Sequence, residues 1–194
     1  WTDTTWSLDI TGKDLILKCA SLRGCTIQSE KTPASSQGLI RAQNITDYFR
    51  VTGFVFVELN TGITSEGGNF VFTCVTNPST CDKLRIDNNT FTDFHNNLMR
   101  VEDAYGVFDN NIVNWCTGAG CAVTVVIQQP TRYGQTGSIG HGAWAQATRL
   151  GTDRFFILET NTFNASSALR AITDCEKGGR YVGRYNSGTD YQFS

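Results

Sequence analysis

The chain has 194 residues, a formal net charge of −2, 19 glycines and 12 phenylalanines. This length allows one domain with a continuous core, and a composition rich in Gly, Phe, Val, Ile and Thr favours strands and turns over helices. The small net charge argues against a nucleic-acid partner held by bulk charge. No apolar run reaches the roughly 18 residues that a membrane-spanning helix needs.

A short phrase recurs along the chain: an apolar strand, a polar residue, Asn, and then a second short strand. In chain order the copies are RVTGFVF at residues 50–56, LRIDNNTF at 84–91, GVFDNNIV at 106–113, FILETNTF at 156–163 and YVGRYN at 181–186. Asn89, Asn111, Asn161 and Asn186 fall in one column, and Phe54 takes that position in the first copy. Such repeats indicate a solenoid, because one unit cannot bury its apolar side until the next unit stacks on it.

The spacing of equivalent positions predicts the coils. Val51, Ile86, Phe108, Leu158 and Gly183 are separated by 35, 22, 50 and 25 residues. A further apolar strand precedes each phrase, in the segments 38–43, 69–74, 97–102, 122–127 and 168–173. The sequence therefore predicts about five coils of three strands in a single domain, residues 1–194, with a loop excursion at about residues 129–153.

Asparagine suits the repeated column because its side chain can bond the backbone of a tight turn and the Asn of the next coil. We expect these asparagines to form a structural ladder rather than a ligand site. For the same reason Phe56, Phe91 and Phe163 are predicted to stack in the core.

The Ile-Asp-Asn-Asn-Thr-Phe phrase, the Leu-Gly-Thr-Asp lead-in at residues 150–153 and the segment 179–186 carry a family resemblance. Over about residues 14–186 the chain resembles the right-handed parallel β-helix proteins of the pectin-lyase-like superfamily, in particular secreted or phage-encoded members of unassigned activity. The resemblance implies an all-β fold and a binding groove along the long, loop-bordered strands of the coils. It implies fold more than function. No cap is apparent at the terminal coil, so we expect a fragment or one segment of a longer helix.

Six of the seven cysteines lie in close pairs, which suits local disulfides that close turns. The predicted bonds are Cys19–Cys25, Cys74–Cys81 and Cys116–Cys121, with Cys175 free or linked outside the chain. Disulfides would indicate an extracellular setting, and the alternative is that several cysteines are small buried apolar residues. Asn44, Asn88 and Asn164 begin sequons and are candidate glycosylation sites.

Alternation along the third strand predicts an outward column. If Ile40, Val71, Met99, Val123 and Leu169 face the core, the outward residues are Arg41, Phe72, Arg100, Thr124 and Arg170. Arginines two coils, about 10 Å, apart could pair with uronate or sulfate groups of a polysaccharide. The alternative is that they are surface residues paired with Glu102, Glu58 or Asp103.

The excursion supplies a second set of candidates. Its glycine-rich sequence contains Arg132, Tyr133, His141 and Trp144. Loops this long in compact domains are usually functional or disordered. Gly-His-Gly at residues 140–142 resembles a fragment of the polygalacturonase signature, but the paired aspartates of that family are absent upstream.

A polysaccharide lyase needs a cation or Arg to neutralise the uronate and a base near the reacting carbon. Glu102, Asp103 and Asp174 could hold Ca²⁺ if the protein is a lyase, and no other cofactor or metal is expected. Since no complete catalytic set is recognisable, we expect an extracellular or virion-surface structural or adhesive segment. Its expected partners are a polysaccharide or cell-surface glycan on the outer strand face and further copies at uncapped ends. The alternative is a lyase or glycoside hydrolase that acts on an acidic glycan.

Overall fold

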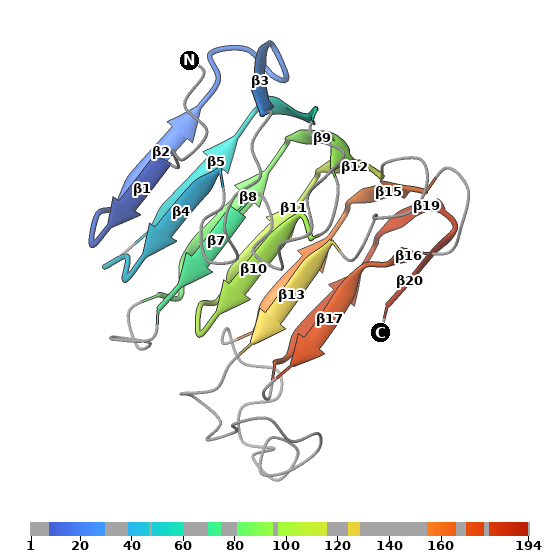
Figure 1. The fold of residues 1–194 in the computed structure, drawn as a ribbon. Helices are drawn as coiled ribbons and strands as arrows, with labels where there is room; N and C mark the ends of the chain where they lie inside the picture. Colours follow the sequence, from blue (N-terminus) through green and yellow to red (C-terminus); the bar gives the residue numbers. More distant parts are fainter. Residues whose placement is uncertain are drawn as a thin grey trace, which may run out of the picture.

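The computed structural model describes residues 8–29, 39–46, 48–59, 70–74, 81–94, 97–115, 124–128, 155–165, 170–176 and 179–193. These residues form three parallel six-stranded sheets, and each sheet takes one strand from every coil (Figure 1). The fold is therefore an all-β parallel β-helix, as predicted. No helix among the described residues could span a membrane.

Sheet A holds β1 (Leu8–Thr11), β4 (Ile40–Gln43), β7 (Phe70–Thr73), β10 (Met99–Glu102), β13 (Val125–Gln128) and β17 (Thr173–Glu176). Sheet B holds β2 (Leu15–Lys18), β5 (Phe49–Thr52), β8 (Leu84–Asp87), β11 (Gly106–Asp109), β14 (Phe156–Glu159) and β18 (Tyr181–Arg184). Sheet C holds β3 (Cys25–Ser29), β6 (Phe54–Glu58), β9 (Thr90–Phe94), β12 (Ile112–Trp115), β15 (Thr162–Asn164) and β19 (Ser187–Thr189). A small fourth sheet pairs β16 (Arg170–Ala171) with β20 (Tyr191–Gln192).

The predicted register of sheet B is confirmed. Val51 pairs with Ile86, Ile86 with Phe108, Phe108 with Leu158, and Leu158 with Gly183. Val51, Ile86, Phe108 and Leu158 are completely buried. Alternation along each strand directs this column into the core, so every coil closes the apolar side of its neighbour.

The described residues form six coils, one more than the roughly five predicted. The missed coil comprises β1, β2 and β3, in which Leu17 pairs with Val51 and Cys25 pairs with Phe54. Its repeat is hard to see in the sequence, because six residues separate Lys18 from Cys25 where later coils have one or two between the equivalent strands.

One left-handed residue makes the turn from sheet B to sheet C in each of the last five coils. These residues have positive φ angles and are Gly53, Asn88, Asn110, Thr160 and Tyr185. Glycine and asparagine tolerate this conformation better than other residues do. The Asp-Asn-Asn phrase is therefore a turn code: the first Asn takes the left-handed position and the second joins the ladder.

The asparagine ladder forms as predicted. The Asn111 Oδ1 accepts hydrogen bonds from the backbone N–H of Asn89 at 2.9 Å and from its Nδ2 at 3.3 Å, while the Asn111 Nδ2 donates to the Ile86 carbonyl at 2.8 Å. The same contacts link Asn111 to Asn161 and Asn161 to Asn186. At the start of the ladder the Phe54 N–H donates to the Asn89 Oδ1 at 3.0 Å. The column is structural, because its buried amides replace water as partners of turn backbone groups.

Aromatic rings fill the core beside this ladder. Phe56 and Phe91 stack at 5.3 Å between ring centroids with planes 9° apart, and Phe163 packs on Trp115 at 5.8 Å. All four rings are buried. The prediction that Phe56, Phe91 and Phe163 are core residues is confirmed.

The last coil carries a cover that the sequence did not reveal. β20 places Tyr191 against Phe163 at 5.8 Å, and Phe193 stacks on Tyr181 at 5.7 Å. A Cβ on Gly183 would lie 2.7 Å from the Phe193 ring, so glycine gives that ring its space. Tyr191 and Phe193 thus cover part of the core of the last coil, while most residues of β18 and β19 are exposed.

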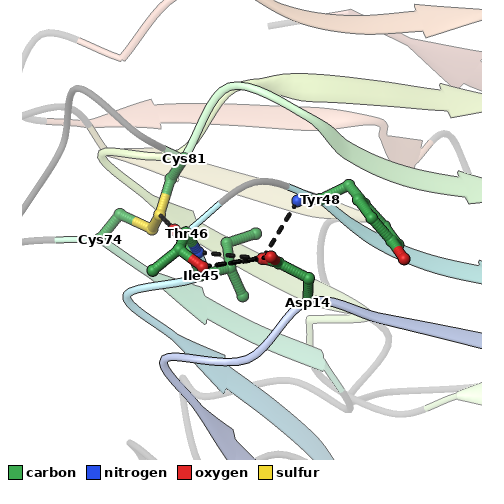
Figure 2. The surroundings of a disulfide bond; sticks show 6 residues. All are labelled: Asp14, Ile45, Thr46, Tyr48, Cys74 and Cys81. Carbon is green, nitrogen blue, oxygen red and sulfur yellow. Dashed lines mark hydrogen bonds between the residues drawn. A yellow bond between two sulfur atoms is a disulfide. The ribbon is translucent and has the colours of Figure 1, made fainter.

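Two predicted disulfides, Cys19–Cys25 and Cys74–Cys81, are present. Figure 2 shows Cys74–Cys81 beside the turn of the preceding coil, where the Cys81 sulfur lies 3.3 Å from the Ile45 carbonyl oxygen. Asp14 of the first coil accepts hydrogen bonds from the backbone N–H groups of Thr46 and Tyr48 at 3.2 and 3.3 Å in the same turn (Figure 2). Backbone groups outside the strands are thus fixed by a neighbouring coil. Cys116–Cys121 lies outside the described residues.

Candidate functional site

The outward face of sheet A is the surface on which a glycan contact was predicted. Figure 1 shows its six strands side by side along the length of the molecule. The register gives one outward column of Asp9, Arg41, Val71, Arg100, Val126 and Asp174. Next to it runs a second outward column of Thr11, Gln43, Thr73, Glu102, Gln128 and Glu176.

Arg41 and Arg100 belong to the outward column as predicted, two coils apart, but Phe72 does not. Phe72 pairs with Ala42 and Val101 and is 1% exposed, inside the core. The segment Phe70-Val71-Phe72 is apolar throughout, so alternation could not set its phase, and the two larger side chains take the inward positions. Val71 therefore points away from the core cluster that contains Phe70 and Phe72, although it is only 3% exposed.

Two further members of the predicted column are also wrong. Thr124 precedes β13, and the outward position of that strand is Val126. Arg170 pairs with Tyr191 in the small fourth sheet, and the outward position of the last coil is Asp174. The inward residues were predicted to be Val123 and Leu169, but Val125 and Thr173 occupy these positions, two and four residues later. The error arises because each strand begins after the start of its apolar run.

The arginines of this face are paired with protein groups. The Arg41 Nη1 lies 3.7 Å from the Asp9 carboxylate. The Arg100 Nη2 lies 3.4 Å from the Glu102 Oε2 and donates to the Gln128 Oε1 at 3.0 Å. Their side chains are 25% and 21% exposed, so much of each stem is covered by neighbouring atoms. The alternative of surface ion pairing thus holds for Arg100 with Glu102, and Arg41 has Asp9 as its partner.

The face is acidic at its C-terminal end. The Gln128 Nε2 donates to the Glu176 Oε2 at 2.5 Å, and Asp174 lies two residues before Glu176 on the same side of β17. Desolvation of the carboxyl group by neighbouring atoms, and then the charge of Glu176, raise the pKa of Asp174. A negatively charged sugar would meet repulsion at this end.

Cys175 is exposed and forms no disulfide. Desolvation of the thiol, followed by the charge of Asp174, raises the pKa of Cys175 to about 12. Since the thiolate is the reactive form, this cysteine has little nucleophilic character at neutral pH.

The three predicted Ca²⁺ ligands do not converge. Glu102 faces outward on β10, whereas Asp103 is completely buried in the turn that follows. Asp174 lies two strands away from Glu102 and in the other outward column. Across the described ranges no group of three or more His, Cys, Asp or Glu side chains could hold a metal ion.

Sheet B carries two bidentate ion pairs among the described residues, which the sequence interpretation missed. The Arg50 Nε and Nη2 donate to the two carboxylate oxygens of Asp87, one coil away, at 2.7 and 2.6 Å. Arg85 donates in the same bidentate manner to Asp109 at 3.0 and 2.7 Å. Bidentate Arg–carboxylate pairs are among the strongest hydrogen-bonded contacts in proteins.

The environment of Asp87 shows how this pairing works. Its side chain is completely buried, and it also accepts hydrogen bonds from Thr52 at 3.1 Å and from the Nδ2 of Asn88 at 2.6 Å. Burial alone would raise the pKa of Asp87, but the hydrogen bond and charge of Arg50, the bond from Asn88 and the charge of Arg85 lower it overall. The carboxylate therefore stays ionised inside the stack of coils. The signal in the sequence is an Arg two residues before a polar position, repeated in successive coils.

The remaining predicted sites are placed only in part. Arg132, Tyr133, His141 and Trp144 lie outside the described residues. Of the sequon residues, the Nδ2 of Asn164 donates to Asn114 at 2.9 Å and that of Asn88 donates to Asp87, so both amides are engaged. Asn44 is half-buried in the turn after β4 with φ 47°.

No protein-family model matches the chain, and no curated protein or solved structure matches it either.

Proposed function

We propose that the protein is a non-catalytic structural and adhesive β-helix, a rigid shaft that acts outside the cell or on a virion surface. The observation that carries this proposal is the use of its arginines. On the strands of sheets A and B, every arginine whose side chain is described is paired with a carboxylate of its own or an adjacent coil: Arg41, Arg50, Arg85, Arg100 and Arg184. Arginines that pair with carboxylates within a coil or between coils stabilise the rod, and little of their charge is available to bind a substrate.

Other features agree with a shaft. The asparagine ladder and the stacked core repeat in successive coils and make the molecule stiff along one axis. Two disulfides suit an oxidising compartment. The Asp-Asn-Asn phrase resembles phrases of pectin-lyase-like β-helices, and we include membership of that superfamily in the proposal.

The test is an activity and binding screen on pectate, alginate and sulfated glycans. We expect no new ultraviolet absorbance from unsaturated products and no new reducing ends. We also expect the double variant Arg41→Gln/Arg100→Gln to bind these polymers as the wild type does, because both arginines are already paired. Product release would overturn the non-catalytic role, and loss of binding in the double variant would restore an anionic-glycan site on sheet A.

One observation favours a second candidate, a glycoside hydrolase. Asp174, with its raised pKa, lies beside Glu176 on an exposed strand, and hydrolases use one protonated and one ionised carboxyl group. Release of reducing ends by the wild type, abolished in both Asp174→Asn and Glu176→Gln, would support it over the shaft.

A further inference from the structure

Tyr185 occupies a position where a bulky side chain is costly. It is the left-handed residue between sheets B and C in the last coil, with φ 58°, where the four preceding coils have Gly53, Asn88, Asn110 and Thr160. A bulky residue rarely adopts this conformation, and such strain tends to persist where a function requires it. The ring is also 79% exposed, so core packing does not compensate for the strain.

The ring is held in place by its neighbours. The guanidinium carbon of Arg184 lies 5.8 Å from the centroid of the Tyr185 ring, within the range of a cation–π contact. Arg184 is itself anchored, since its Nε donates to the Glu159 Oε2 at 2.6 Å. The Tyr185 ring is thus an exposed aromatic surface that the Arg184–Glu159 ion pair holds in place, and this ion pair carries no net charge.

Small polar side chains continue from this ring along the corner of the molecule. Thr160, Asn110 and Asn88 take the same turn position in successive coils. The Nδ2 groups of the two asparagines are held by Asp109 and Asp87 at 2.8 and 2.6 Å, so their amide oxygens can accept hydrogen bonds from outside. The corner therefore presents one aromatic ring followed by hydroxyl and amide groups at the strand spacing of about 4.8 Å.

From this arrangement we propose that the corner formed by Tyr185, Thr160, Asn110 and Asn88 binds an extended polysaccharide, with one uncharged pyranose ring stacked on Tyr185. The flat C–H face of a pyranose carries a small positive charge, which suits the negative face of an aromatic ring. Successive sugar units advance by about the strand spacing, so their hydroxyl groups would meet Thr160 and the asparagines. The inference rests on the adhesive part of the proposed function and assigns it to this corner instead of sheet A.

The chain itself supplies the matched variant. Tyr185→Asn replaces the ring by the residue that Asn88 and Asn110 contribute at the same turn position. We expect it to weaken binding of cellohexaose at least tenfold by calorimetry and to raise Tm by about 2–4 °C, since the left-handed strain is relieved. Tyr185→Phe, which keeps the ring, should bind within twofold of wild type. Tyr48→Ala removes another partly exposed tyrosine and should leave binding unchanged.

The proposed site would be wrong if Tyr185→Asn bound cellohexaose as tightly as the wild type does. It would also be wrong if the wild type bound no cellohexaose. A lower Tm in Tyr185→Asn would show that the ring has a structural role and would also contradict the proposal. Tighter binding of hexagalacturonate than of cellohexaose would contradict the uncharged ligand class. These results are distinct from failure of the non-catalytic role, which would appear as release of products from the polymers.

Discussion

At the scale of single residues, the fold depends on asparagines that substitute for water at buried turns. The Asn111 side chain bonds four backbone or amide groups, from Asn89, Ile86 and Asn161, and the residue is 1% exposed. A side chain without both a donor and an acceptor cannot fill this role, because either Asn89 or the Ile86 carbonyl would be left unpaired inside the protein.

Asn111→Ala should therefore lower the free energy of unfolding by about 2–4 kcal/mol, measured by urea denaturation. Asn186→Ala is the matched control. Asn186 ends the ladder and is only half-buried, so its replacement should cost less than half as much. Equal losses at the two positions would show that the ladder is no more stabilising in the interior than at its end.

Asp87 gives the molecule a defined response to acid. Its folded-state pKa is lowered, so its contribution to stability is present above the ordinary carboxyl pKa of 3.8 and is lost as the pH falls through the lower folded-state value. Arg50→Gln should lower the free energy of unfolding at neutral pH by about 2–3 kcal/mol, because a charged hydrogen-bond partner of a buried carboxylate is removed.

The same variant should lose stability at a higher pH than the wild type when unfolding is followed by urea titration between pH 2 and 7. Arg184→Gln is the control, because its pair with Glu159 is solvent-exposed and should change the acid response little. An unchanged acid transition in Arg50→Gln would mean that Arg50 does not determine the ionisation of Asp87.

At the scale of elements, strand pairing could be predicted where the turn chemistry is explicit. Asp-Asn-Asn fixed the position of the turn, so sheet B and the start of sheet C were placed correctly around Ile86 and Phe108. Sheet A lacks such a marker in most coils. Along Phe70-Val71-Phe72, either phase of the alternation directs apolar side chains into the core, two phenylalanines in one phase and one valine in the other. Only the packing of the three sheets against one another decides between the two phases.

The same uncertainty about the phase of alternation affected the prediction of the candidate site. A glycan column was predicted on alternation alone, and a shift of one residue moves Phe72 from the surface to the core. Ion pairs between coils could not be predicted either, because Arg50 and Asp87 are 37 residues apart and meet only when the register is known.

Disulfides constrain segments of the chain that lie outside the sheets. Cys74 and Cys81 link the end of β7 to the segment before β8, with 6.1 Å between their Cα atoms. The variant Cys74→Ala/Cys81→Ala should lose about 2–3 kcal/mol of unfolding free energy, the value that loop-closure entropy gives for a short loop.

Peptide mapping without reduction should recover Cys19–Cys25 and Cys74–Cys81 as crosslinked pairs. Cys175→Ser is the control, because Cys175 forms no disulfide, and it should change stability much less than the double variant does. A double variant as stable as the wild type would show that Cys74–Cys81 does not stabilise the fold.

At the scale of the whole molecule, the arrangement of charge argues against simple end-to-end stacking. In-register addition of β1 of one copy to β17 of another would place Asp9 beside Asp174, and β2 on β18 would place Lys18 beside Arg184. Like charges on directly adjacent strands are destabilising. We therefore expect contacts of the shaft to involve its sides.

Within the molecule, charge has the opposite role and joins adjacent coils. A double-mutant cycle on Arg85 and Asp109 tests this most directly. Arg85→Gln, Asp109→Asn and the double variant are unfolded in urea at pH 7. We expect a coupling energy of about 1–3 kcal/mol, as for a bidentate pair with a buried carboxylate. A coupling energy below about 0.5 kcal/mol would place the pair with ordinary surface ion pairs and would contradict the view that these arginines hold the coils together.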